Sequence, residues 1–160
     1  MSKNPNKVVA LSGGFDPLHI GHIQFFKDAS EYGKVVVILN SDEGIIRKKG
    51  FCFMPWTERH RMITSIPWVS DVVKVDDRYG NVTSAISKLK PDYFGNGGSR
   101  KRTNTSKAEI ALCEKEGITM LWNLGENSFQ DANIAIIQSR LMKEMIKLIQ
   151  KYEEIKNWEK

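Results

Sequence analysis

The sequence VVALSGGFDPLHIGH, residues 8–22, begins with a short run of β-branched and apolar residues. Val8 to Ser12 is typical of a buried strand, and Gly13-Gly14 directly after it indicates a tight turn. Pro17 suits the first turn of a helix, where a missing backbone N–H costs nothing. The stretch therefore predicts a strand, a glycine turn and a helix over residues 17–30.

The apolar run Val35-Val36-Val37-Ile38-Leu39 comes next and is typical of a strand buried on both faces, as parallel strands are. Strand and helix patterns go on alternating along the chain. We expect strands at 72–75, 93–95 and 118–122, and helices at 57–66, 82–89, 106–116 and 139–158. This order predicts an α/β fold with a Rossmann-like, doubly wound parallel sheet of five strands, helices on both faces and a long C-terminal helix.

The length of 160 residues suits one domain over 1–160, with a core at about 7–137 and the C-terminal helix at about 138–158. No apolar run approaches the roughly 18 residues of a membrane span, and the polar start lacks the apolar stretch of a signal peptide. Cys52 and Cys113 match no metal or redox spacing. We therefore expect a cytoplasmic protein without a membrane partner.

The net charge of +5 is concentrated in two short segments that contain no acidic residue, 44–57 and 95–107. The segments carry more positive charge than the whole chain does, so the remaining residues are slightly acidic. Their cations are Arg47, Lys48 and Lys49 in the first, and Arg100, Lys101, Arg102 and Lys107 in the second. This placement argues against a broad basic face for nucleic acid and predicts a small polyanion as the ligand.

His19 and His22 lie three residues apart, so their imidazoles share a face of the predicted helix, and Gly21 between them leaves room for a ligand. The two glycines before them allow a close approach of the backbone, and a helix N-terminus attracts anions. A phosphate site follows from this pattern. A zinc pair would lack an obvious third ligand, buried imidazoles would need partners, and a dinucleotide-binding turn would need the spacing G-x-G-x-x-G.

The same stretch resembles the His-x-Gly-His signature of the cytidylyltransferase-like nucleotidyltransferases. That superfamily includes glycerol-3-phosphate cytidylyltransferase and the adenylyltransferase of ADP-heptose synthesis. Other stretches match in order and approximate spacing, so the similarity covers about residues 7–125: Asn40-Ser41-Asp42, Arg47-Lys48-Lys49-Gly50, Thr57-Glu58-Arg59 and Trp68-Val69-Ser70-Asp71-Val72-Val73. His-Ile-Gly-His is also similar to class I aminoacyl-tRNA synthetases, but the second signature and the tRNA-binding domain of those enzymes do not fit in this chain.

The resemblance implies an enzyme that transfers a nucleotidyl group, with CMP favoured, from a nucleoside triphosphate to a phosphorylated sugar or polyol and releases pyrophosphate. An ATP-dependent adenylyltransferase of the sugar-phosphate type is the alternative, and a non-catalytic nucleotide sensor is an alternative of another class. Mg²⁺ is expected to arrive with the triphosphate, held by its oxygens and water, without metal ligands from the chain.

The resemblance also implies roles for individual residues. The expected catalytic residues are His19, His22, Lys49 and Arg100. The expected nucleotide-binding residues are Gly13, Gly14, Phe15, Asp16, Gly21, Lys48, Arg59, Gly95, Asn96, Gly97 and Ser139, and those for the acceptor are Asp42 and Arg78. Two choices stay open: which of Lys48 and Lys49 contacts phosphate, and whether Ser128 or the favoured Ser139 replaces the family's Ser/Thr motif. Asn96 and Ser99 stand where many relatives carry an acid.

The last predicted helix carries an apolar seam, formed by Leu141, Met145, Leu148, Tyr152 and Ile155. Their spacing of 4, 3, 4 and 3 has the period that pairs two helices. Packing of the first half on the chain's own sheet is an equal alternative. For the second half the pattern favours a homodimer.

Overall fold

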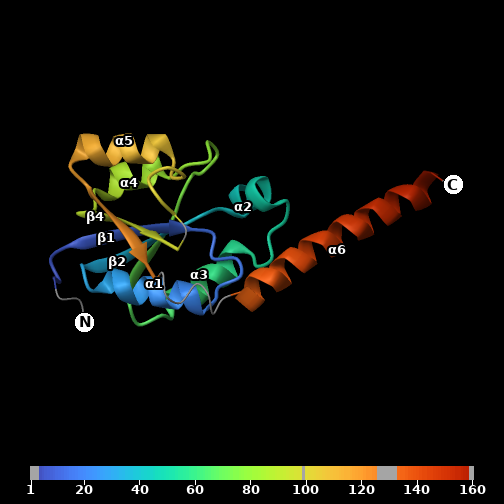
Figure 1. Ribbon diagram of the computed structural model, residues 1–160, viewed down its shortest axis with the longest axis horizontal. Helices are drawn as coiled ribbons and strands as arrows, with labels where there is room; N and C mark the ends of the chain where they lie inside the picture. The colour runs from blue at the N-terminus through green and yellow to red at the C-terminus, as the bar shows by residue number, and fades with distance from the viewer. Residues whose placement is uncertain (1–3, 99, 126–132, 159–160) are drawn as a thin grey trace.

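The computed structural model describes residues 4–98, 100–125 and 133–158, and within the last range it describes the side chains of 140–154. The elements follow in the order β1 (Val8–Gly13), α1 (Ile20–Ser30), β2 (Lys34–Leu39), α2 (Asp42–Lys49), α3 (Trp56–Thr64), β3 (Val69–Lys74), α4 (Thr83–Leu89), β4 (Tyr93–Gly97), α5 (Lys107–Glu116), β5 (Thr119–Leu124) and α6 (Asn133–Trp158). Figure 1 shows that α6 extends away from the body that the other elements form.

The strands form one parallel sheet in the order β3-β2-β1-β4-β5, which confirms the predicted fold. β1 lies in the middle, where Leu11 pairs with Val37 of β2 on one side and with Gly95 of β4 on the other. The chain builds outward from β1 to β3 and then crosses back to β4, so the winding reverses at β1. Ligands of such sheets bind outside the carboxyl ends of the strands at that reversal.

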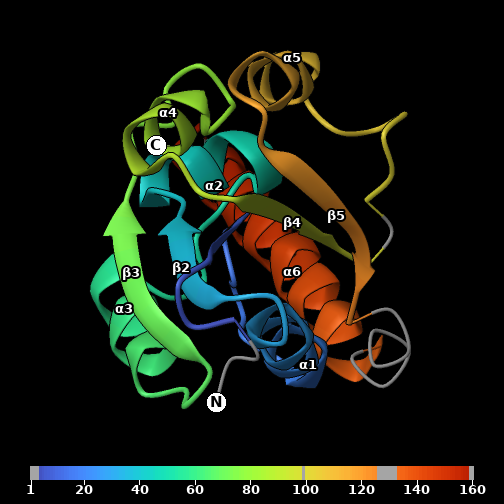
Figure 2. The ribbon, with the colours of Figure 1, turned by 90° about the vertical axis from the view of Figure 1, so that its left-hand side faces the viewer.

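Helices cover both faces of the sheet (Figure 2). α1 and α3 lie on one face, where Phe26 and Ile63 are buried against inward side chains of the strands. α4 and α5 lie on the other face and bury Ile86 and Cys113 there. The strand side chains alternate between the two layers, because Leu11 packs in the first layer and its neighbour Ala10 in the second.

α1 begins at Ile20, three residues later than the sequence predicts, and His19 is its N-cap in an extended conformation. Residues before it form a turn in which Phe15 has a φ of 49°, a left-handed conformation that a helix does not contain. His19 therefore caps α1 from outside the helix, and His22 lies at the third position of its first turn. They still share one face at its N-terminus.

α2 covers residues for which the sequence analysis predicted no helix. Ser41 caps it by accepting a hydrogen bond from the N–H of Gly44 at 2.8 Å. Acidic residues occupy its first turn and basic residues its last, which suits the helix dipole at both ends. The glycines at 44 and 50 concealed this short helix in the sequence.

Two further helix starts differ from the prediction. Pro55, not Thr57, is the N-cap of α3. α6 begins at Asn133, so Ser139 lies six residues inside the helix instead of at its start. The side chain of Ser139 is outside the described part of the structure, and so is Ser128. The two side chains predicted to bind phosphate near the start of α6 therefore both lie outside the described part of the structure.

α6 exposes four members of the predicted apolar seam: Leu141, Met145, Leu148 and Tyr152 are 56–67% exposed. The side chain of Ile155 lies outside the described part. The first half of the seam does not pack on the sheet of its own chain. None of the helices in the described ranges is long and apolar enough to cross a lipid bilayer.

Candidate active site

Two adjoining cavities open at the carboxyl ends of the central strands. The larger has a volume of about 630 Å³ and lies between the end of β2, α2 and the segment after β3. The smaller has a volume of about 150 Å³ and lies between the ends of β1 and β4 and the first turn of α1. Ser12, Gly13, Gly14 and Arg100 line both. The predicted glycine turn therefore forms the wall that the two cavities share.

His19 and His22 stack on each other, with ring centroids 3.6 Å apart. The backbone N–H of His19 donates to Nδ1 of His22 at 3.3 Å. A ring nitrogen that accepts a hydrogen bond carries no proton, so in neutral His22 the proton is on Nε2. His22 lines the smaller cavity and presents a donor at the helix N-terminus.

The environment of the pair keeps both imidazoles neutral. Burial, the neighbouring His19 and the charge of Lys49 lower the pKa of His22 to about 3. Burial and Lys49 also lower the pKa of His19. Neutral imidazoles can donate hydrogen bonds but bring no charge, so positive charge at this site must come from other residues.

The described cations that line the larger cavity are Arg47, Lys48, Lys49, Arg78 and Arg100. Lys49 differs from its neighbour Lys48, which is exposed. Its ammonium donates to the backbone oxygen of Asp16 at 2.6 Å, beside the glycine turn, and burial lowers its pKa. The structure therefore directs Lys49 toward the histidine pair and leaves Lys48 at the rim.

β4 brings Gly95, Asn96 and Gly97 to the smaller cavity, as predicted. A side chain at Gly95 would meet Leu11 at 2.4 Å, so this glycine is required by packing as well. Asn96 is 1% exposed, and its amide nitrogen faces the carbonyl oxygens of Phe94 and Leu121 at 3.5 and 3.4 Å. Its Oδ1 is buried without a hydrogen-bond partner among the described residues.

Phe15 and Asp16 lie in the turn between β1 and α1, beside the histidine pair. The ring of Phe15 is buried and meets the His22 ring edge-on, with centroids 4.9 Å apart. The carboxylate of Asp16 accepts the backbone N–H groups of Phe53 and Met54 at 2.8 and 2.7 Å. Asp16 thus ties the first turn to the segment between α2 and α3.

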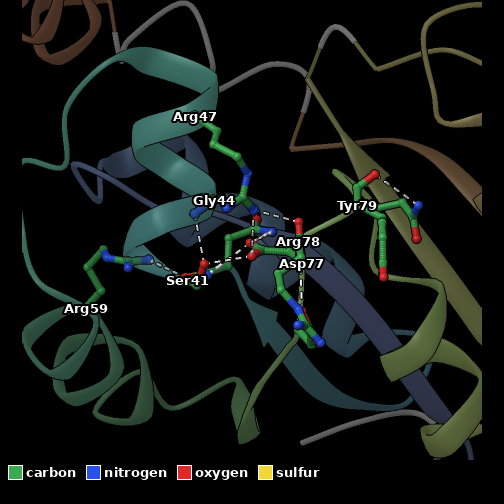
Figure 3. A network of polar contacts seen from close by, with 10 residues as sticks. Ser41, Gly44, Arg47, Arg59, Asp77, Arg78 and Tyr79 are labelled. Carbon is green, nitrogen blue, oxygen red and sulfur yellow. Dashed lines mark hydrogen bonds and ion pairs between the residues drawn. The ribbon is translucent and has the colours of Figure 1, made fainter.

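A network around Asp77 borders the larger cavity and was missed by the sequence analysis (Figure 3). The carboxylate, 4% exposed, accepts hydrogen bonds from Asn40 Nδ2 and from Ser41 N and Oγ at 2.7–3.0 Å, and pairs with Arg47 at 3.3 Å. Although burial opposes ionisation, these donors lower the pKa of Asp77. A Cβ at Gly44 would lie 2.1 Å from its Oδ2. A glycine in the first turn of a helix, where it weakens the helix, was the available signal.

Of the residues expected at the acceptor, Arg78 lines the larger cavity and Asp42 does not border it. The guanidinium of Arg78 forms a two-pronged contact with Asp76, at 2.9 and 2.6 Å. Asp42 instead pairs with Arg59 at 2.5 Å. Gly21 is buried in α1, and its carbonyl oxygen lies beside Gly125 at the end of β5.

The fold and the cavities define an α/β protein with a cation-lined site at the carboxyl edge of its sheet. Residues 10–157 match the family model described as cytidylyltransferase-like, and the chain belongs to this family. The family predicted from the sequence is therefore confirmed.

The chain is similar to several curated proteins over part of their length. The FAD synthase of Pyrococcus abyssi (strain GE5 / Orsay) is 37% identical over 61% of this chain and 66% of that protein. The bifunctional protein HldE of Campylobacter concisus (strain 13826) is 33% identical over 68% of this chain and 23% of that protein. The chain thus spans less than two thirds of either relative.

A solved structure shares the fold. It is the crystal structure of the lipopolysaccharide core biosynthesis protein from Thermoplasma volcanium GSS1, with a TM-score of 0.58 and 24% sequence identity over 73% of this chain and 93% of that chain.

The pKa of His22 predicts how stability depends on pH. Below pH 6.5 the unfolded chain protonates His22, whereas the folded chain does so only near pH 3. The free energy of unfolding therefore falls as the pH falls through this window. In His22→Asn, whose Oδ1 can accept the same N–H, urea unfolding between pH 7 and 4 should show a shallower fall than in the wild type. His60→Asn on α3 is the control, and equal slopes in wild type and His22→Asn would contradict the assignment.

Proposed function

We propose that this protein is a nucleotidyltransferase that transfers a nucleotidyl group from a nucleoside triphosphate to a phosphorylated small molecule and releases pyrophosphate. The observation that carries the proposal is the wall shared by the two cavities. The glycine turn and Arg100 border both cavities, the neutral donor of His22 lies on the side of the smaller cavity, and Lys49 lies on the side of the larger one. Two reacting phosphates would meet across this wall.

The reaction needs position and charge neutralisation more than a covalent intermediate. A phosphate oxygen of the acceptor attacks the α-phosphorus of the triphosphate, and the bond from that phosphorus to the bridging oxygen breaks. Pyrophosphate takes the electron pair of the broken bond. His22 and His19 donate hydrogen bonds to the α-phosphate, Lys49 neutralises charge building on it, and Arg100 receives the leaving pyrophosphate.

In this proposal the nucleoside part of the donor enters the smaller cavity, its phosphates extend past the shared wall toward Lys49, and the acceptor lies in the larger cavity. Asn96 suits the first assignment because its buried Oδ1 calls for a donor that a base or ribose supplies. Arg47 and Arg78 suit the second because they border a space with room for a phosphorylated small molecule.

Mg²⁺ accompanies the triphosphate in this proposal and is held by phosphate oxygens and water. The carboxylates near the cavities suit that arrangement, since Asp16 and Asp77 already accept hydrogen bonds and Asp42 is paired with Arg59. The ion would neutralise charge on the phosphates while the residues above orient them.

The sequence favours CTP as the donor, whereas the comparisons support ATP. One relative is named FAD synthase, and FAD contains an adenine nucleotide. Both triphosphates therefore belong in the first test, with phosphorylated sugars, polyols and flavin mononucleotide as acceptors.

A panel of the four triphosphates against these acceptors, with Mg²⁺ and a pyrophosphate assay, tests the proposal. We expect one pair to release pyrophosphate only when both partners are present. His19→Ala should lower turnover about 100- to 1000-fold, as the loss of one oxyanion donor does, at an unchanged melting temperature. A wild-type protein that binds a triphosphate but releases no pyrophosphate with any acceptor would be a sensor instead.

The two lysines at the end of α2 give a matched comparison. Lys49→Met should lower kcat/KM about 10- to 100-fold, because a charge-assisted hydrogen bond to phosphate is lost. Lys48→Met should stay within about threefold, as expected of an exposed charge. Steady-state kinetics with saturating acceptor separate the two, and equal losses would contradict the distinct role of Lys49.

We also propose a homodimer through α6, because the exposed seam residues Leu141, Met145, Leu148 and Tyr152 share one side of a helix that extends away from the body (Figure 1). Two such helices would cover each other's apolar residues. Light scattering at micromolar concentration should give twice the chain mass for the wild type and one chain mass for Leu148→Glu. Gln150→Glu, on the opposite side of α6, is the control and should stay dimeric; a monomeric wild type would refute the dimer.

A further inference from the structure

Arg59 of α3 is a buried cation surrounded by protein acceptors. Its side chain is 0% exposed, and a guanidinium cannot lose its charge in a protein. Nε donates to the carbonyl oxygen of Met54 at 2.9 Å, and Nη2 donates to Asp42 at 2.5 Å. Nη1 donates to the carbonyl oxygens of Gly14 at 2.8 Å and Asn40 at 3.0 Å. Since a buried charge is costly unless it is paired and hydrogen-bonded, these segments are held around it.

The two carbonyl groups on Nη1 belong to the turns that border the cavities. Gly14 follows β1 and lines both cavities, and Asn40 follows β2 and lines the larger one. The C=O and N–H of a trans peptide point in opposite directions. By holding the oxygen of Gly14, Arg59 therefore sets the direction of the N–H of Phe15, a residue of the smaller cavity.

The peptide after β2 is held from both sides. Arg59 binds the oxygen of Asn40, and the N–H of Ser41 in the same peptide donates to Asp77 at 3.0 Å. Ser41 is also the N-cap of α2, which carries Lys49 in its last turn. The position of Lys49 therefore depends on how this peptide is fixed.

Asp42 completes the arrangement by neutralising Arg59. Burial opposes ionisation of Asp42, but the N–H of Trp56 and the guanidinium of Arg59 outweigh it and lower the pKa of this carboxyl. Asp42 belongs to α2 and Arg59 to α3, so the ion pair between them also joins these two helices. Figure 3 shows Arg59 on the side of Ser41 away from Arg47.

We propose that Arg59 is a positioning residue of the active site, which fixes the turns after β1 and β2 relative to each other without touching either substrate. Asp42 is its partner in this role. The inference rests on the proposed function for its activity readout. It departs from the resemblance, which implies that this arginine contacts a phosphate of the nucleotide.

Direct contact with a nucleotide conflicts with the geometry. A guanidinium has five N–H donors, and protein acceptors already take four of those of Arg59. The side chain is 0% exposed, so a phosphate could reach the remaining N–H only by displacing the segments that surround the guanidinium. By contrast, Arg100 is half-buried and borders both cavities.

The test compares Arg59→Lys, Asp42→Asn and the double variant with the wild type. Lysine keeps the charge but cannot reach four separated acceptors, so Arg59→Lys should lower kcat/KM about 100-fold, as a small misplacement of catalytic groups does. Asp42→Asn should lower it in the same direction. Because both act through one network, the double variant should lose little more than the worse single variant. Arg61→Lys, on the exposed side of α3, is the matched control and should leave the kinetics unchanged.

Direct phosphate contact gives the opposite result for Asp42→Asn. Freeing the guanidinium from its carboxylate partner would leave nucleotide affinity unchanged or raise it, whereas positioning requires it to fall. Affinity for ATP and CTP is measured by titration of intrinsic fluorescence. A normal or tighter binding by Asp42→Asn, together with a loss in Arg59→Lys, would overturn the proposal.

A readout without substrate keeps this inference separate from the proposed function. In ¹H–¹⁵N spectra the amide signals of Phe15 and Ser41 should shift in Arg59→Lys and Asp42→Asn, while those of α5 stay in place. If the wild type proves inactive with every substrate pair, these shifts still support positioning, and unchanged signals of Phe15 and Ser41 refute it. Should Arg59→Lys fail to fold, Asp42→Asn alone decides by the same shifts and titrations.

Discussion

The buried guanidinium of Arg59 is the interaction on which the site depends, because one unremovable charge requires acceptors from several segments at once. The turn after β1, the end of β2, the start of α2 and the segment before α3 each supply one. The sheet ends beside these pieces, where the N–H of Asn40 donates to the carbonyl oxygen of Gly13 at 3.0 Å. The strands place the segments near one another, and the guanidinium sets their separations.

In this site hydrogen-bond donation and positive charge come from different residues, whereas a charged histidine pair would supply both. Burial and Lys49 keep His19 and His22 neutral, so their N–H groups supply direction without net charge. Positive charge comes from α2 and from Arg100 after β4, on the opposite side of the cavities. Only Asp77 brings a carboxylate to the described lining of the larger cavity, and its oxygens are engaged by donors from Asn40, Ser41 and Arg47. The cations of the chain therefore gather at the larger cavity, where they would attract a polyanion.

α2 links the two halves of this arrangement. Its first turn is fixed by Ser41, Asp42 and the close packing of Gly44 on Asp77. Its last turn carries Arg47, Lys48 and Lys49 over the larger cavity. A helix holds these side chains at set angles, whereas a mobile loop would lose conformational entropy each time it closed over a ligand.

Apart from α2, the order of strands and helices was determined by the sequence alone, as were the parallel sheet and the family. Runs such as Val35 to Leu39 can be buried only in a sheet covered on both faces, and the turn at Gly13-Gly14 followed by His19 and His22 is a local pattern. The helix starts were less accurate, because His19 and Pro55 act as caps through backbone conformation that residue type does not reveal. Only the tertiary structure decided that Lys49 turns inward, that Asp77 meets Gly44, and that Arg59 binds carbonyl groups 19 and 45 residues away. Those contacts join segments distant in sequence, and their direction depends on how the strands bring the segments together.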